Sequence, residues 1–182
     1  METIEKLREE LLVIRCRLGE LSAYRELVEM FESRLLYYIR RIVNDEESAY
    51  DILQEVWLVV LHRIKILRDT KAFRSWLYKI AHDKAVSKIR SEIVLEKTRV
   101  EFQIHNSDFV EWEWNVDLIT IIHRLLDQLP IQQREVFILF FLEELNYEEI
   151  AKITGTNIGT VKSRLFYAKK AIRAHLKEYK NV

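Results

Sequence analysis

The sequence predicts an all-α protein made of two small helical bundles joined by an acidic, flexible linker. Its 182 residues include only three glycines and one proline, so the chain has few of the residues that tight β-turns need. Apolar residues recur at helical spacing in both halves of the chain, whereas the middle loses this periodicity and becomes acidic. We therefore expect a first domain at 1–90, a linker at 91–115 and a second domain at 116–182.

Composition excludes several other classes of protein. The single cysteine, Cys16, cannot form a disulfide framework, and the three glycines do not build a phosphate-binding loop. The longest apolar run, 136–142, is far shorter than the about 20 residues that cross a membrane, and the charged N-terminus lacks a signal-peptide core. We expect a soluble, cytoplasmic protein with reduced cysteine and no membrane insertion.

The first bundle is predicted to contain four helices, at 4–17, 23–43, 46–65 and 71–90. Their candidate N-caps are Ser22, Asn44 or Asp45, and Thr70. Apolar residues of the third helix recur at the spacing of one buried stripe, which comprises Leu53, Val56, Trp57, Val60, Leu61 and Ile64. The apolar residues of the first helix suit either packing on the bundle or binding of a regulator, and they are Leu7, Leu11, Ile14 and Leu18.

The second bundle is predicted to begin with helices at 116–128 and 131–144, the latter starting after Pro130. Asn146 with Glu149 has the spacing of a capping box, which opens a short helix. This helix is expected to end near residue 154.

Gly155 then provides the helix stop, because glycine tolerates a left-handed backbone. Asn157 is the expected cap of a last helix that runs to about residue 179.

The charges are strongly clustered although the net charge is zero. Nine lysines and arginines oppose two aspartates in 63–90, and eight basic residues oppose one glutamate in 152–182. Between them, 92–117 holds seven acidic residues against two basic ones. A single charged run is a solvated face about as often as it is a binding surface. Two basic blocks around an acidic connector instead favour binding of a polyanion at two places.

The segment NYEEIAKITGTNIGTVKSRLFYAKKAI, residues 146–172, has the pattern of a helix-turn-helix. The inward face of its second helix is predicted to hold Ile158, Val161, Leu165, Ala168 and Ile172. The opposite face carries Ser163, Phe166, Tyr167 and Lys170, flanked by Thr160 and Lys162. An outward Phe can pack on thymine methyl groups in the major groove.

The alternative is an αα-hairpin whose lysines only complement the helix dipole. The turn glycine, the small Ala151, the capping residues and the basic outer face agree with one another. Together they favour DNA binding by this half of the chain.

Two separate stretches resemble bacterial sigma-70-type initiation factors of the extracytoplasmic-function group. LPIQQREVFILFFLEELNYEEIAKITGTNIGTVKSRL resembles region 4, and both DILQEVWLVVLHRI and FRSWLYKIAHDKAVSKIR resemble region 2. The resemblance covers about 20–90 and 118–177. It implies a sigma factor that is not an enzyme, needs no cofactor or metal, and has core RNA polymerase, promoter DNA and an anti-sigma factor as partners.

In that family, region 2 docks on the polymerase clamp helices and captures and melts the minus-ten element, while region 4 reads the minus-thirty-five element and touches the polymerase flap. By resemblance, the polymerase contact on the third helix comprises Asp51, Gln54, Glu55, Leu58 and His62. Periodicity alone would make this an ordinary solvated face.

By the same resemblance, the minus-ten contacts comprise Leu67, Lys71, Arg74, Trp76, Lys79, Asp83 and Lys84. Basic residues that hold phosphates beside a pocket for an unstacked base suit capture of a single strand. The alternative for Trp76 is a place in the core, because it shares helical spacing with Phe73 and Leu77.

The minus-thirty-five contacts are predicted to comprise Thr160, Lys162, Ser163, Arg164, Phe166, Tyr167, Lys169 and Lys170. Arg164 and Lys169 suit phosphate contacts better than base contacts.

Asp83 departs from the family, whose members commonly have Asn at this position. A carboxylate accepts hydrogen bonds but cannot donate as an amide does. The departure predicts a changed base preference, toward an amino-bearing base such as cytosine or adenine.

Functions of other kinds are less well supported by the sequence. A DNA-binding regulator that never joins polymerase would need no strand-capturing region, and a bundle used only for protein interaction does not explain the helix-turn-helix. An enzyme is disfavoured because none of the five histidines has a metal-ligand spacing such as H-E-x-x-H; they are His62, His82, His105, His123 and His175.

Overall fold

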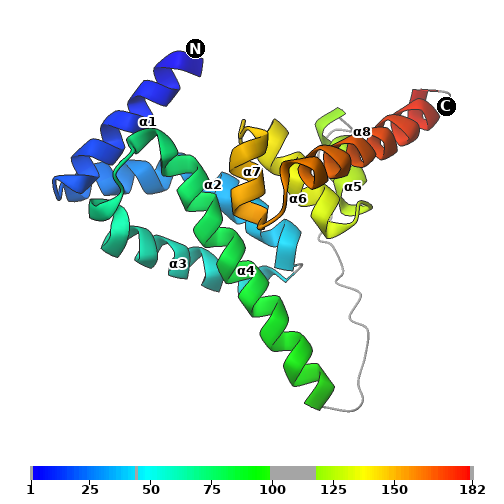
Figure 1. Cartoon of the computed structure of the whole chain (residues 1–182), viewed down its shortest axis with the longest axis horizontal. Coiled ribbons are helices and arrows are strands. Elements are labelled where there is room, and N and C mark those ends of the chain that lie inside the picture. The colour runs from blue at the N-terminus through cyan, green and yellow to red at the C-terminus, as the bar shows by residue number, and fades with distance from the viewer. Residues whose placement is uncertain (1, 44, 99–117, 181–182) are drawn as a thin grey trace. The chain divides into compact units, whose positions relative to one another are not determined.

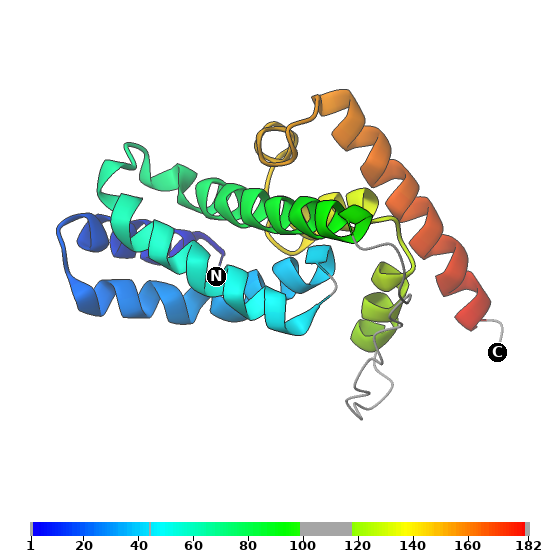
Figure 2. The ribbon, with the colours of Figure 1, turned by 90° about the horizontal axis from the view of Figure 1, so that it is seen from below.

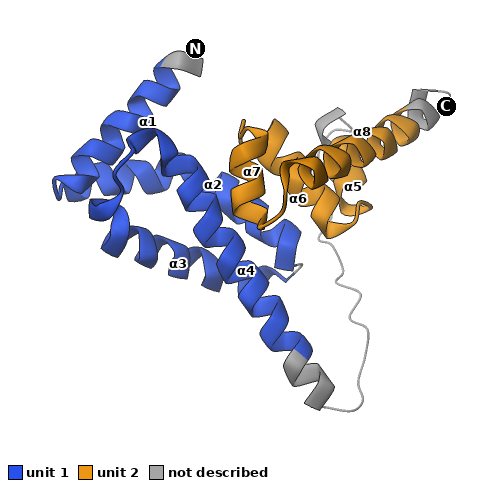
Figure 3. Cartoon of the chain, in the orientation of Figure 1, with its two compact units in different colours: residues 1–100 blue, residues 101–182 orange. Residues whose placement is uncertain are grey.

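The computed structural model describes residues 2–43, 45–98 and 118–180, and these form eight α-helices and two short 3-10 helices with no strand. The chain divides into two compact units, unit 1 at residues 1–100 and unit 2 at residues 101–182 (Figure 3). The predicted all-α fold with two helical bundles is confirmed.

Unit 1 is built around the long helix α2 (Leu21–Val43). Its elements are α1 (Glu2–Arg17), α2 (Leu21–Val43), α3 (Glu46–Arg63), η1 (Ile64–Ile66), η2 (Thr70–Ala72) and α4 (Phe73–Thr98) (Figure 1). Helix α2 packs against α1, α3 and α4, and Figure 2 shows these helices running alongside one another. The ring pairs Phe31–Phe73 and Tyr38–Tyr78 join α2 to α4, with centroids 5.6 and 5.1 Å apart.

The N-cap predictions for unit 1 are confirmed at one helix and wrong at two. The Asp45 side chain accepts a hydrogen bond from the Ser48 backbone N–H at 2.7 Å, as expected for α3. Ser22 lies inside α2, because the backbone carbonyl of Glu20 already accepts from Tyr24 N–H. Thr70 lies inside η2, because the Asp69 side chain accepts from Lys71 N–H at 3.0 Å.

Replacing Asp45 with alanine is expected to lower the free energy of unfolding by about 1 kcal/mol, because a backbone N–H of the first turn of α3 loses its acceptor. Hydrogen bonds to Ser48 lower the pKa of Asp45, so the stabilisation is present above the ordinary aspartate pKa and is lost as pH falls through the lowered value. Urea unfolding at pH 7 and pH 3 measures both effects. An Asp45→Asn variant is the control, since asparagine also caps helices; equal stability of the alanine variant would contradict the assignment.

Helix α4 continues to Thr98, eight residues beyond its predicted end at Arg90. The extension contains neither glycine nor proline, and an i, i+4 ion pair joins Lys88 to Glu92 at 3.4 Å. The acidic residues after Arg90, from which the sequence predicted the end of the helix, therefore lie inside α4 as far as Thr98. The rest of the predicted linker, 99–115, lies outside the described residues.

Helix α1 packs on the bundle through a face that does not include the four apolar residues named from the sequence. Leu12, Val13 and Cys16 are buried, whereas Leu7, Leu11, Ile14 and Leu18 are exposed. Of the two alternatives for the latter four, packing on the bundle is therefore excluded, and binding of a regulator stays untested. In α3, Leu61 is also exposed, at 39%, while the other five members of the predicted stripe are buried.

Unit 2 contains α5 (Leu118–Asp127), α6 (Ile131–Phe141), α7 (Tyr147–Thr154) and α8 (Ile158–Lys180). Helix α8 contacts each of the other three. Helix α6 ends three residues before the predicted end at residue 144, where Glu144 adopts a left-handed backbone with φ 54° and turns the chain toward α7.

The helix-turn-helix forms as predicted. Asn146 and Glu149 make both hydrogen bonds of a capping box at the start of α7, and Gly155 ends that helix with a left-handed φ of 65°. The Asn157 side chain accepts from Thr160 N–H at 2.7 Å. Of the predicted inward residues only Ile158 is wrong: it is 38% exposed, whereas Val161, Leu165, Ala168 and Ile172 are buried.

Candidate functional site

The outer face of α8 gathers all eight residues predicted to contact the minus-thirty-five element. Phe166 and Tyr167 are 60% and 55% exposed, with their rings in edge contact at 5.5 Å. Thr160 and Arg164 are half-buried, and the remaining members are exposed, namely Lys162, Ser163, Lys169 and Lys170. Because Val161, Leu165 and Ala168 bury the opposite face, this basic and aromatic face is held outward.

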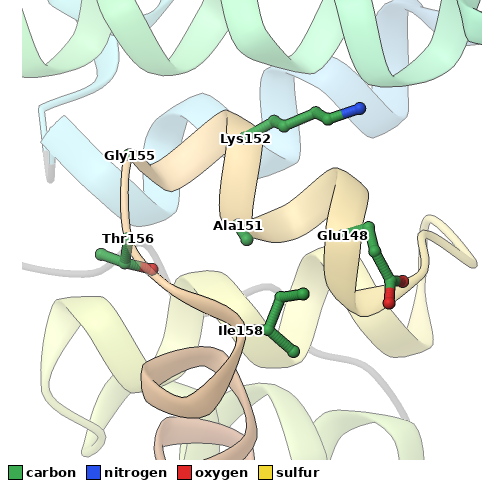
Figure 4. Close-up of a pocket in the computed structure, with 6 residues that line it drawn as sticks. All are labelled: Glu148, Ala151, Lys152, Gly155, Thr156 and Ile158. Carbon is green, nitrogen blue, oxygen red and sulfur yellow. The ribbon is translucent and has the colours of Figure 1, made fainter.

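The turn between α7 and α8 explains the exposure of Ile158. Figure 4 shows Ala151 on α7 and Ile158 at the start of α8 on either side of a surface pocket, which Glu148, Lys152, Gly155 and Thr156 also line. The Lys162 ammonium lies 5.5 Å from the centre of the Tyr147 ring, so α7 and α8 are also joined at their outer side. The left-handed Gly155 and the Asn157 cap set where α8 begins.

The chemistry of the α8 face suits duplex DNA. No acidic residue occurs in α8 between Ile158 and Lys177, so the face has no carboxylate to repel phosphate. Lysine and arginine can contact phosphates, while Phe166 can meet thymine methyl groups and the Ser163 hydroxyl can bond a base edge.

The predicted polymerase face of α3 is exposed along its whole length. Asp51, Gln54, Glu55 and His62 are exposed, and Leu58 between them is 57% exposed. Leu61, one turn from Leu58, belongs to the same surface. The sequence assigned Leu61 to the core because its spacing fits the edge of the buried stripe. The result is an apolar spot among acidic and polar side chains.

A contact from α2 holds α3 in place beneath this face. The Tyr24 hydroxyl donates to the Trp57 carbonyl oxygen at 2.6 Å, and the two rings meet edge to face at 6.1 Å. Burial raises the pKa of Tyr24 to about 12, so the hydroxyl keeps its proton at neutral pH. Sequence reasoning missed this contact because the two residues lie on different helices.

The residues predicted to capture the minus-ten element lie around η1, η2 and the first half of α4. Lys71 is exposed, Leu67 is half-buried, and Trp76 is half-buried beside Phe73, with ring centroids 6.1 Å apart. The Lys79 ammonium lies 2.6 Å from the Asp83 carboxylate.

Lys84 of α4 donates to the Glu55 carboxylate of α3 at 2.7 Å. This ion pair connects the predicted polymerase face directly to the predicted minus-ten surface.

Arg74 does not belong to the exposed basic surface, and its assignment as a DNA contact is wrong. The side chain is buried, donates to the Glu9 carboxylate of α1 at 2.7 Å, and lies 5.6 Å from the centre of the Phe31 ring. It therefore anchors α1 to α4. Burial raises the pKa of Glu9 in spite of the neighbouring guanidinium.

Replacing Arg74 with alanine is expected to lower the free energy of unfolding by about 3 kcal/mol, because the buried Glu9 loses its hydrogen-bonded counter-charge and keeps only the weaker influence of Arg34. A raised Glu9 pKa favours the folded state at low pH and loses that effect as pH rises, so the destabilisation should be smallest at acidic pH. Lys71→Ala is the matched control; it should change stability by less than about 0.5 kcal/mol. Chemical unfolding between pH 4 and pH 8 measures both. Equal effects of the two variants would contradict the assignment.

Comparison with known families identifies both halves of the chain. The family model "Sigma-70 region 2" matches residues 27–92, and "Sigma-70, region 4" matches residues 119–172. The chain belongs to the sigma-70 family. It is 34% identical over 142 residues to RNA polymerase sigma factor SigV of Bacillus subtilis, with 74% of this chain and 79% of that protein covered. It is 29% identical to the ECF RNA polymerase sigma-E factor of Escherichia coli, with 92% of this chain and 94% of that protein covered.

A solved structure of similar fold is that of the sigma factor RpoE in complex with the anti-sigma factor NepR from Bartonella quintana. Its TM-score is 0.72 at 20% identity, and the match covers 85% of this chain and 96% of that one. The sigma-70 family consists of transcription initiation factors and not of enzymes. Within the described part of this chain no group of His, Cys, Asp or Glu is arranged to hold a metal ion, and no helix there is long and apolar enough to cross a membrane.

Proposed function

We propose that this sigma-70 family protein binds core RNA polymerase in the cytoplasm and directs it to specific promoters. Unit 1 contacts the polymerase clamp through the α3 face and captures and melts the minus-ten element along η2 and α4. Unit 2 reads the minus-thirty-five element with α8. The observation that carries this proposal is the order of two matched regions, region 2 and then region 4, with a basic and aromatic face exposed on α8.

The length of the linker sets a condition on simultaneous contact at both elements. Two promoter elements about two helical turns apart are separated by about 70 Å. Residues 99–117, which lie between α4 and α5, reach about 65 Å when fully extended. The linker must therefore be almost fully extended, with the width of the units covering the remainder. A flexible chain of this length averages only about 25 Å, so polymerase must hold each unit on its own binding site. An acidic linker suits passage through the basic RNA channel of the enzyme.

A protein that restrains the free factor is the remaining partner. The solved relative RpoE is in complex with an anti-sigma factor, and by analogy we propose an anti-sigma factor for this chain.

Asp83 is proposed to alter the preference for the unpaired base of the minus-ten element. It is exposed on α4 and paired with Lys79. Asp83→Asn provides a donor group. It should therefore change the ratio of transcription between the preferred base and the other bases at one position by about tenfold, the size of one hydrogen-bonded base contact. Transcription from promoters with each of the four bases at that position measures it. An unchanged order of the four promoters would contradict this role.

Run-off transcription with purified core polymerase over a promoter library tests the proposed function. We expect transcripts only when the protein is added, with enrichment of two sequence elements at one fixed spacing. Protein that binds duplex DNA but neither joins core polymerase nor starts transcripts would instead be a regulator outside initiation.

A further inference from the structure

Helix α1 carries a second apolar face that unit 1 does not cover. While Leu12, Val13 and Cys16 are buried against the bundle, five apolar residues on the opposite side are between 44% and 76% exposed; this exposed stripe comprises Ile4, Leu7, Leu11, Ile14 and Leu18. Helix α1 lies at the edge of unit 1 (Figure 1).

The spacing within the exposed stripe alternates between three and four residues. This is the repeat of positions a and d in a heptad, which forms the seam between two packed helices. A continuous exposed apolar surface on a small domain marks an interaction site. The stripe lies on α1, so neither the α3 polymerase face nor the α4 and α8 DNA surfaces include it.

The charges along the two edges of the exposed stripe differ. On one edge, Arg15 pairs with Glu20 at 2.8 Å and with Glu26 at 3.4 Å, and Arg8 lies 3.9 Å from Glu26. Acidic residues of α2 and of the turn before it therefore engage Arg15, while Arg8, whose side chain is 63% exposed, lies at the outer limit of ion-pair distance from Glu26.

On the other edge lie Glu10 and Arg17, two turns apart along the helix. Neither forms an ion pair with another residue in the part of the chain that the structure describes. Lys6 also lies on this edge but has a partner of its own. The charges that a second copy can meet are therefore Glu10, near the middle of α1, and Arg17, at its end.

We propose that the exposed stripe of α1 binds the α1 helix of a second copy of this chain, in antiparallel orientation. A twofold axis then places Leu11 against the second copy's Ile14 and Leu7 against the second copy's Leu18, so the same contacts occur twice. Glu10 of each copy meets Arg17 of the other. The apolar seam and the edge with Glu10 and Arg17 are both self-complementary in this arrangement, whereas the other edge brings Arg8 of one copy near Arg15 of the second copy.

The parallel orientation fits the edge charges less well. In a parallel pair, residues at the edge positions meet five residues further along the partner helix, which would place Glu10 beside Arg15 of the second copy. That guanidinium is already engaged by Glu20 and Glu26, and Arg17 would have no acidic partner. The proposal therefore commits to the antiparallel pair.

Sedimentation equilibrium of the full-length protein, without polymerase or DNA, tests self-association. We expect a concentration-dependent dimer, and we expect Leu11→Glu to raise its dissociation constant at least tenfold. Glu5→Arg, also on the exposed part of α1 but outside the stripe, should leave the dissociation constant unchanged. Helix content by circular dichroism confirms that each variant folds. The proposal would be overturned if the native protein is monomeric at about 0.1 mM and throughout a 100-fold dilution from there. A dimer unaffected by Leu11→Glu would also overturn it.

A charge exchange tests the orientation. Glu10→Arg and Arg17→Glu should each weaken the native-like dimer several-fold, because each places like charges together twice. Mixed in equal amounts, the two variants should form a dimer of one copy of each, since every edge contact then joins opposite charges. If Arg17→Glu has no effect, or if the mixture stays dissociated, the antiparallel pairing is wrong. Because the readout involves no transcription, its failure leaves the proposed initiation function intact.

Discussion

Leu58→Glu should weaken the binding of core RNA polymerase by about 100-fold, the effect of losing a central apolar contact worth about 3 kcal/mol. Leu58 is 57% exposed beside the exposed Leu61 on α3, and a glutamate there would bring a charge into the contact. Neither side chain fills the core of unit 1, so the variant should fold normally.

Affinity for fluorescent core polymerase measures the effect. Ile93→Glu is the matched control, because Ile93 is an exposed apolar residue of unit 1 on α4, 46% exposed, outside the α3 face. We expect the control to change affinity by less than threefold. If both variants bind core polymerase as tightly as the native protein, α3 is not the polymerase contact.

Phe166→Glu should lower transcription from a promoter that needs its minus-thirty-five element by about 100-fold. The substitution removes an apolar contact with the bases and turns a carboxylate toward DNA, and each base contact is worth about 1–3 kcal/mol. Phe166 is 60% exposed, so the loss should come from DNA binding and not from folding.

Phe166→Leu is the conservative control for this prediction, because it keeps an apolar group in the groove. It should retain most of the activity, and a promoter that starts without an upstream element should respond to neither variant. Lys169→Ala should instead weaken binding evenly across sequences and reduce the salt dependence by about one counterion. A loss of activity with Phe166→Glu on both kinds of promoter would show that α8 acts elsewhere.

Local signals made the helix-turn-helix predictable from sequence. The capping box at Asn146, the left-handed Gly155 and the Asn157 cap each depend on residues at most four positions apart, and all are confirmed. The outward face of α8 followed from them, because helical periodicity fixes which residues share a side.

Contacts between distant residues account for what the sequence could not predict. The sequence placed Arg74 in the basic block at 63–90 and predicted a DNA contact. Its partner Glu9 lies 65 positions earlier in the chain, so local spacing could not reveal the ion pair. The same limit applies to α1: periodicity singled out one apolar stripe on the helix but did not show that Leu12, Val13 and Cys16 pack on the bundle instead. Residues at the edges of apolar stripes, Leu61 and Ile158, were likewise assigned to the core although they are exposed.

The central claim is that the two units of one chain contact two separate promoter elements while polymerase holds both. Photo-cross-linking in a complex with core polymerase and promoter DNA tests it most directly, with a cross-linking amino acid placed at Lys71 of unit 1 or at Lys169 of unit 2, both exposed. The account predicts cross-links from Lys71 to the melted minus-ten strand and from Lys169 to the minus-thirty-five duplex of the same promoter, both requiring polymerase. Cross-links from both positions to a single element, or identical cross-links without polymerase, would contradict it.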